Sequence, residues 1–186
     1  MTELRIVRSR RKTLALQVLP TGEIVARAPL RLPERDIHAF AEQHAAWLEA
    51  AVARARAGSR AAQRAGILSE AELQRLRTAA RADLTERVTR LAARMGVDFA
   101  GITIRAQRTR WGSCSARGSL SFNCLLMLAP PEMREYVAVH ELCHRKQMNH
   151  SAAFWREVAL WLPDYAAQRA WLREHGPALL GRLPKT

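Results

Sequence analysis

The stretch His140-Glu141-Leu142-Cys143-His144, followed by His150, decides how this chain is interpreted. Residues four apart share one face of a helix, so His140 and His144 can direct their rings at one metal ion. Glu141 follows the first histidine directly, and its carboxylate can reach a water molecule held on that metal. Three neutral imidazoles leave a zinc ion one open position for this water, whose pKa falls toward ~7. The pattern therefore predicts one catalytic Zn²⁺ held by His140, His144 and His150, with Glu141 as general base.

The spacing of the third histidine predicts a break in the helix. In a continuous helix, His150 would lie about 9 Å beyond His144 along the axis, too far to share a metal ion with it. We therefore expect the helix to end near Asn149, a residue type that tolerates the left-handed conformation of helix ends. Ser151 is then a suitable N-cap for a second helix. Glu157 is the alternative third ligand, but it follows His144 closely for that role, and we favour His150.

Several motifs flank this stretch, and together they point to a family. They are Thr109-Arg110-Trp111-Gly112-Ser113-Cys114-Ser115, Gly118-Ser119-Leu120-Ser121-Phe122-Asn123, Leu128-Ala129-Pro130-Pro131-Glu132, Asn149-His150-Ser151, Phe154-Trp155 and Pro163-Asp164-Tyr165. In this order they resemble the YgjP-like metallopeptidase-domain family, which is related to the SprT-like and WLM zinc metalloproteases. The resemblance is strong over roughly residues 101–175, and a weaker one covers residues 8–12 with the strands that follow.

The resemblance implies a fold and a reaction. The expected fold is α+β, a minimal zincin-like metalloprotease core with a small N-terminal β module. In that core, a small twisted sheet packs on a supporting helix and on the HExxH helix. The expected reaction is the hydrolysis of peptide bonds by a zinc metallopeptidase.

Hydrophobic patterns divide the chain into three parts. Residues 1–32 form an N-terminal β-strand module, residues 33–68 a helix and linker, and residues 69–186 the zincin-like catalytic domain. The first part alternates apolar and polar residues at 4–7, 14–18 and 24–28, which predicts three strands. In the second part, apolar residues recur at helical spacing from Pro33 to Val52. An Ala/Arg/Gly-rich linker follows from Arg54 to Gly66, with a partly helical conformation as the alternative.

The catalytic part begins with a strong helix signal. Ser69 and Glu72 form a capping box, which predicts a long helix running toward Met95-Gly96. Strands are predicted at 102–105, 110–115 and 120–128. Pro131 suits the first turn of the helix that carries the histidines.

An extended peptide substrate is expected to lie along the exposed edge of this sheet, bonding strand to strand. Trp111, Gly112 and Asn123 lie in the segments that could supply the edge, and Gly112 would let a backbone come close. Arg110 is a further candidate for shaping the groove. Tyr165 is a candidate donor to the oxyanion, with packing as the alternative role.

Composition and charge constrain the remaining properties. Three cysteines, without a C-x-x-C pair, argue against a disulfide framework or a zinc ribbon, and we expect Cys143 to pack in the core. The beginning of the sequence has no apolar run, and no stretch reaches the ~20 apolar residues of a membrane span, so we expect a cytoplasmic protein without membrane contact. Thirty Lys and Arg against 17 Asp and Glu give a net charge of +13. Either a GC-rich genome or binding to nucleic acid or another polyanion accounts for this excess.

Two other functions remain open at this level. One is a zinc-dependent hydrolase of a non-peptide substrate such as a nucleotide, and the other is a DNA-associated protease of the WLM or SprT type.

Overall fold

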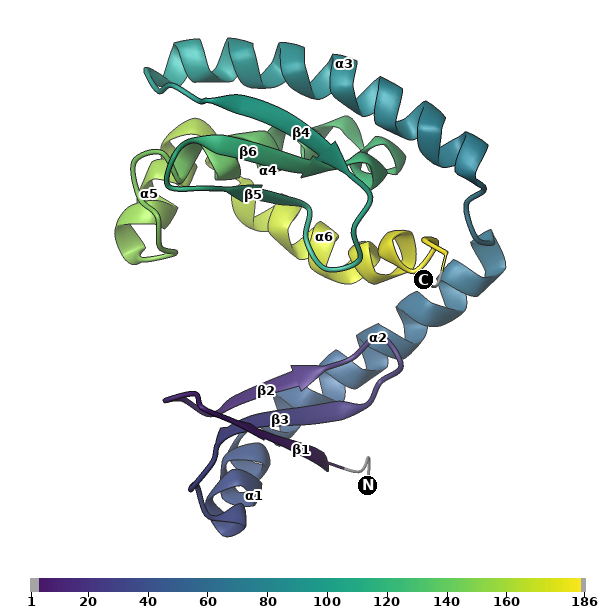
Figure 1. Cartoon of the computed structure of the whole chain (residues 1–186), viewed down its shortest axis with the longest axis vertical. Coiled ribbons are helices and arrows are strands. Elements are labelled where there is room, and N and C mark those ends of the chain that lie inside the picture. Colours follow the sequence, from purple (N-terminus) through teal and green to yellow (C-terminus); the bar gives the residue numbers. More distant parts are fainter. Residues whose placement is uncertain (1–3, 185–186) are drawn as a thin grey trace.

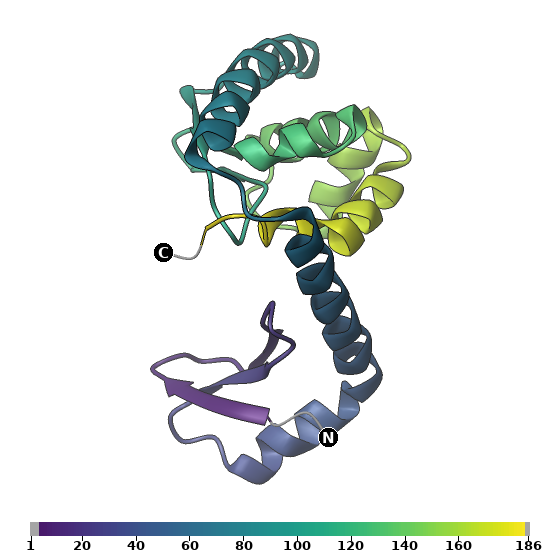
Figure 2. The same ribbon diagram turned by 90° about the vertical axis from the view of Figure 1, so that its right-hand side faces the viewer.

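A computed structural model describes residues 4–184, which form two α+β parts joined by one long helix (Figures 1 and 2). The N-terminal part contains β1 (Leu4–Ser9), β2 (Ala15–Val18), β3 (Ile24–Pro29) and α1 (Glu34–Gln43). Its three strands have the order β1-β3-β2, with β1 parallel and β2 antiparallel to β3. The three predicted N-terminal strands are therefore confirmed.

Helix α2 (Ala45–Ala65) connects the two parts. The single helix predicted from Pro33 to Val52 is divided at His44, whose φ of −108° and ψ of 16° interrupt the helical geometry. The segment from 54 to 66, expected as a linker that could be partly helical, is helical over nearly its whole length, because α2 continues to Ala65. Its small residues Ala55, Gly58 and Ala62 are buried, and tertiary packing of this kind stabilises a helix that propensity alone leaves marginal.

The catalytic part begins with α3 (Glu70–Met95) and a small sheet. The predicted capping box is confirmed: the Ser69 side chain accepts from the backbone N–H of Glu72, and Glu72 accepts from the backbone of Ser69. Strands β4 (Gly101–Arg105), β5 (Gly112–Cys114) and β6 (Ser119–Asn123) have the order β4-β6-β5. Strand β4 is parallel and β5 antiparallel to β6, so β5 is an edge strand.

The third predicted strand of this sheet is shorter than expected. It ends at Asn123, and the remaining residues form the 3₁₀-helix η1 (Cys124–Leu128). The cause is local, because the side-chain carbonyl of Asn123 accepts from the backbone N–H of Leu125 and caps the tight turn.

Three helices complete this part: α4 (Pro131–Cys143), α5 (Ala152–Trp161) and α6 (Tyr165–Leu180). Pro131 occupies the first turn of α4, as predicted. The buried stripe of α3, including Leu84, Val88 and Leu91, shares one core with β6, α4 and α5. The predicted α+β fold, a small sheet with a supporting helix and the HExxH helix, is confirmed. Cys143 is fully buried in this core.

The two parts are held together where α2 crosses α6. A Cβ atom added at Gly58 would lie 2.5 Å from the Pro177 Cβ, so only a glycine allows the helices to come this close. At the end of this contact, the Leu68 amide donates to the Arg182 carbonyl, and the Arg182 side chain donates to the Gly66 carbonyl. The N-terminal part is thus fixed to the last helix of the catalytic part.

Within residues 4–184, no helix combines the length and the apolar character that crossing a membrane requires.

Candidate metal and catalytic site

Three histidines from different local structures converge at one point. His140 lies in the last turn of α4, His144 is the residue that ends this helix, and His150 lies between α4 and α5. One ring nitrogen from each lies within 4.8 Å of the others. His144 is buried, His140 half-buried and His150 exposed, so the cluster has a packed side and an open side.

The route of the chain between the ligands differs from the prediction. Helix α4 ends at Cys143 and not near Asn149, and no described residue other than glycine has a positive φ, so Asn149 does not adopt the left-handed conformation. Instead, the Asn149 side chain accepts from the Ser151 amide at 3.2 Å, which turns the chain toward α5. Ser151 is the N-cap of α5, as predicted, but its side chain makes no capping hydrogen bond.

Glu157 does not join the histidine cluster. Its carboxylate accepts from Lys146 Nζ at 2.7 Å and from Trp161 Nε1 at 3.1 Å. These contacts fix the carboxylate elsewhere, and they leave His150 as the third member of the group.

The ring nitrogens have the chemistry that a metal requires. His144 Nδ1 lies 3.0 Å from the Gln147 carbonyl oxygen, and because a carbonyl only accepts, Nδ1 carries the proton and Nε2 keeps its lone pair. The Nε2 atoms of His140 and His150 lie 3.0 Å apart. Two lone pairs repel at this distance unless a proton or a cation lies between them. Two nitrogen ligands of one tetrahedral zinc stand about 3.3 Å apart, so the three residues fit a single ion.

The protonation states agree with this fit. Burial, with smaller contributions from the neighbouring His144 and His150, lowers the pKa of His140 to about 3. Burial also lowers the pKa of His144. Both rings are therefore neutral at physiological pH, which is the form that binds a metal.

Glu141 points its carboxylate toward β5, where Gly112 makes room for it. A Cβ atom at Gly112 would lie 2.5 Å from Glu141 Oε1 and 2.7 Å from its Cγ. Glu141 is only 4% exposed. Burial raises the pKa of Glu141 to about 8, and the charge of Arg110 opposes this rise. Gly112, expected to accommodate a substrate backbone, thus accommodates the glutamate.

The site opens into two adjoining cavities of about 240 and 280 Å³. Both are lined by Arg110, Gly112, His140 and Glu141. The first also reaches His144 and His150, and the second extends toward α6 along residues that include Trp111, Tyr136, Arg169 and Leu172. The glutamate therefore stands between the metal ligands and a longer cleft.

Two of the residues predicted to contact substrate lie elsewhere. Asn123 is fully buried, and its amide donates to the carbonyl oxygens of Gln107 at 2.6 Å and Arg110 at 2.9 Å. It holds the loop between β4 and β5 from within, so a direct contact with substrate was the wrong assignment. Tyr165 lines neither cavity; its ring stacks on Trp155 at a centroid distance of 5.2 Å.

Trp111 is half-buried, lines the second cavity and packs against α6 at Gly176. Two residues that line the same cavity were missed in the sequence. Tyr136 lies one helical turn before His140, a spacing that could have placed it there. Arg169, whose guanidinium lies over the Trp155 ring at 4.4 Å, carries no such signal, because only the fold brings α6 to the site.

Two of the solved structures that are similar to the chain are metallopeptidase zymogens. Abylysin of Pyrococcus abyssi has 21% identity and a TM-score of 0.44, and the match covers 48% of this chain and 90% of that one. Jannalysin of Methanocaldococcus jannaschii has 18% identity and a TM-score of 0.41, over 47% of this chain and 94% of that one.

A search of curated proteins gave no match. The model of the YgjP-like metallopeptidase domain, in contrast, matches residues 69–175, from the N-cap of α3 into α6. Residues 69–175 are more than half of the 186 residues of this chain. The chain therefore belongs to the YgjP-like metallopeptidase-domain family and is a metal-dependent peptidase.

Proposed function

We propose that this chain is a zinc peptidase in which His140, His144 and His150 hold the ion and Glu141 is the general base. The observation that carries the proposal is the position of Glu141, buried in the cleft beside three convergent imidazoles. Imidazole nitrogens in a tetrahedral arrangement suit zinc, and three protein ligands leave the open position typical of catalytic zinc sites. When bound, the ion would supply Lewis acidity, which acidifies water and polarises a peptide carbonyl.

Glu141 supplies the proton transfers in this scheme. Its carboxylate takes a proton from the attacking water and returns it to the leaving amine. Burial makes the carboxylate a stronger base, and a cation at the histidines would favour its ionised form at neutral pH. Gly112 keeps the carboxylate close to β5 and thereby sets where the water can be deprotonated.

The substrate is proposed to bind as an extended strand along β5. This edge strand pairs with β6 on one side, and its three residues Gly112, Ser113 and Cys114 line the cleft with the histidines. A peptide that adds to such an edge is held by main-chain hydrogen bonds, which do not depend on its sequence. Sequence preference must then come from side chains beyond the edge.

Glu141→Gln tests the proposal. The variant should retain one zinc per chain by mass spectrometry and lose casein hydrolysis about 10²- to 10⁴-fold, the usual contribution of a positioned base. Glu132→Gln is the matched control, because Glu132 lies exposed in the first turn of the same helix. Full casein hydrolysis by Glu141→Gln would refute the assigned base. Hydrolysis of nucleoside triphosphates but not of casein or unfolded protein would refute the peptidase assignment.

A further inference from the structure

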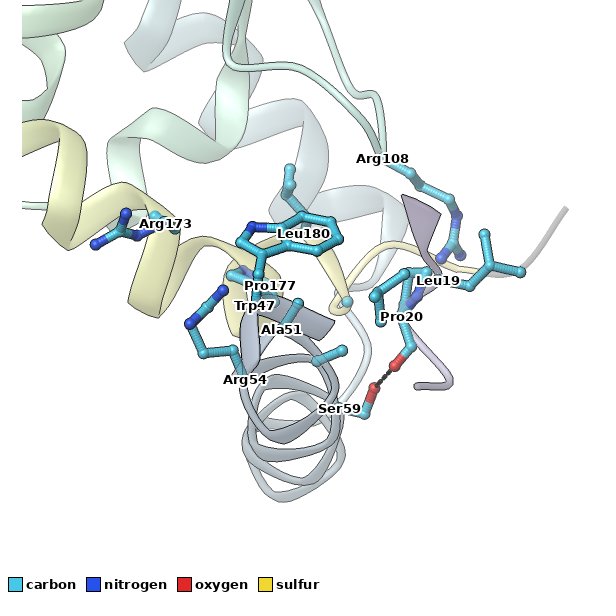
Figure 3. Close-up of a pocket in the computed structure, with 13 residues that line it drawn as sticks. Leu19, Pro20, Trp47, Ala51, Arg54, Ser59, Arg108, Arg173, Pro177 and Leu180 are labelled. Carbon is cyan, nitrogen blue, oxygen red and sulfur yellow. Dashed lines mark hydrogen bonds between the residues drawn. The ribbon is translucent and has the colours of Figure 1, made fainter. Parts of the chain in front are cut away.

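A groove separate from the metal cleft runs between the N-terminal part and α6. It consists of two adjoining cavities of about 320 and 800 Å³, which share Pro20 and Ser59 among their lining residues. Figure 3 shows the first, where the Trp47 ring from α2 lies beside Pro177 and Leu180 of α6. Trp47 is 48% exposed. The floor of the groove is therefore apolar and open to a ligand.

The walls of this groove carry one sign of charge. The lining includes five arginines and no carboxylate: Arg54, Arg56, Arg60, Arg108 and Arg173. None of the five takes part in an ion pair within the described part of the chain. Arg108 donates to the backbone carbonyls of Leu183 and Pro184, which positions its guanidinium without neutralising it. Such a concentration of unpaired charge attracts anions.

The basic lining continues from the groove to the metal cleft along two elements. On α6, Arg173 lines the groove and Arg169 lines the cleft. The two residues are four positions apart, so they lie on one face of the helix and about 6 Å apart along its axis. On the loop between β4 and β5, Arg108 lines the groove and Arg110 lines the cleft. In the cavity of the metal cleft that Arg169 lines, Glu141 is the one acidic residue among the lining residues.

We propose that this groove binds an acidic segment of the peptide substrate, on one side of the bond that is cleaved. The inference rests on the proposed peptidase function, and it adds a substrate class. An extended chain advances about 3.3 Å per residue, so a substrate that passes Arg169 reaches Arg173 after about two residues. Side chains alternate along such a strand, so carboxylates can pair with the arginines while apolar residues contact Trp47 and Leu180.

The observations favour a peptide over a nucleic acid. The groove opens from a cleft whose reaction consumes polypeptide, and its floor is built from Pro177, Leu180 and a single exposed aromatic ring. Proteins that bind single-stranded nucleic acid place several aromatic rings along the strand, one for each stacked base.

Quenched fluorescent peptides test the preference directly. Each has the same neutral, cleavable centre and carries Glu-Leu-Glu-Leu or Gln-Leu-Gln-Leu on either its N-terminal or its C-terminal side. We expect the acidic extension to raise kcat/KM about tenfold on one side only, mainly through KM, as two or three exposed charge pairs would. The gain should fall as the salt concentration rises, because solvent-exposed pairs are screened. Equal cleavage of acidic and neutral peptides at low salt would overturn the proposal.

Two double variants with the same change in net charge locate the effect. Arg54→Gln with Arg173→Gln should reduce the ratio between acidic and neutral peptides to about one. Arg81→Gln with Arg94→Gln, at exposed positions of α3, should leave the ratio as in the wild type. Loss of the ratio in both double variants would show an effect of net charge alone and would contradict a groove site. Melting temperatures verify that both proteins are folded.

A binding measurement separates this inference from the proposed function. Zinc-loaded Glu141→Gln is titrated with the labelled acidic peptide and, separately, with a twenty-nucleotide oligothymidine, and fluorescence anisotropy is recorded. Binding of the peptide that depends on Arg54 and Arg173 supports the groove even if the wild type cleaves no peptide, in which case the peptidase proposal alone fails. Tight binding of the oligonucleotide without binding of the acidic peptide would replace the inference with a nucleic-acid site.

Discussion

Gly112→Ala should reduce catalysis without removing the metal. The new Cβ would lie 2.5 Å from Glu141 Oε1, whereas real Cβ contacts start between 3.0 and 3.4 Å, so the carboxylate must retreat by about 0.5–0.9 Å. A displacement of 1 Å at a reacting group costs about 10²-fold in rate. We therefore expect kcat to fall roughly 10- to 100-fold, equivalent to about 1.4–2.7 kcal/mol in the activation barrier. KM and zinc content should stay the same, because the substitution keeps the main-chain hydrogen-bonding groups of β5 and leaves the histidines in place.

The stability of Gly112→Ala and a matched control variant provide two further tests of this prediction. Overpacking should lower the free energy of unfolding by about 1–3 kcal/mol in Gly112→Ala, and much of that loss should disappear when Glu141 is also replaced by alanine. Gly101→Ala is the control, since Gly101 lies in β4 of the same sheet and its Cβ would meet nothing within 4 Å. A Gly112→Ala enzyme with the kcat and the unfolding midpoint of the wild type would refute the idea that this glycine sets the position of the base.

Three further predictions concern the framework of the site. Asn123→Leu should lower the free energy of unfolding by about 1–3 kcal/mol in urea titrations, because the half-buried carbonyls of Gln107 and Arg110 lose their donor. An unchanged midpoint would contradict the role given to the amide. Gly58→Ala should lower the melting temperature, because its Cβ would lie 2.5 Å from that of Pro177, and a rise would show that α2 and α6 can separate freely. The pKa of Asp83 lies below its ordinary value of 3.8, since burial, which raises it, is outweighed by hydrogen bonds from two arginines. The ionised Asp83 therefore stabilises the fold above that pH, and this contribution is lost as the pH falls. In chelator-treated protein, Asp83→Asn should make the melting temperature fall less steeply with decreasing pH than in the wild type. Parallel plots of melting temperature against pH for the two proteins would refute this.

Local signals were sufficient for much of the fold and for the centre of the site. The capping box at Ser69 and Glu72 marks the start of α3 because both of its hydrogen bonds join residues three apart. His140 and His144 are brought together by helix geometry alone. In both cases the interacting atoms belong to neighbouring residues, so the sequence contains the whole interaction.

The errors come from interactions that the sequence pattern does not encode. The 3₁₀-helix η1 replaces part of a predicted strand because one side-chain hydrogen bond of Asn123 outweighs the apolar pattern of Leu120 to Leu128. The segment around Arg54 to Gly66 reads as a linker by composition, and it becomes helical because its small residues pack on α6, more than a hundred positions away. Gly112 is similar: the residue was identified, but its partner Glu141 could be named only from the packed structure.

The contact between α2 and α6 also constrains the order in which this chain can fold. Gly66 and Arg182, which bond at the end of the contact, lie 116 positions apart, so the small residues of α2 that face α6, Gly58 and Ala62, have no partner until α6 has been synthesised. Long-range contacts of this kind form late and slowly, because a long loop must close before they contribute stability. During synthesis, the nascent chain would therefore expose the surface of α2 that α6 later covers, and transiently exposed apolar surface of this kind is prone to aggregation. The contact between α2 and α6 therefore forms only after α6 is complete. The arginine-lined groove beside this contact forms at the same stage.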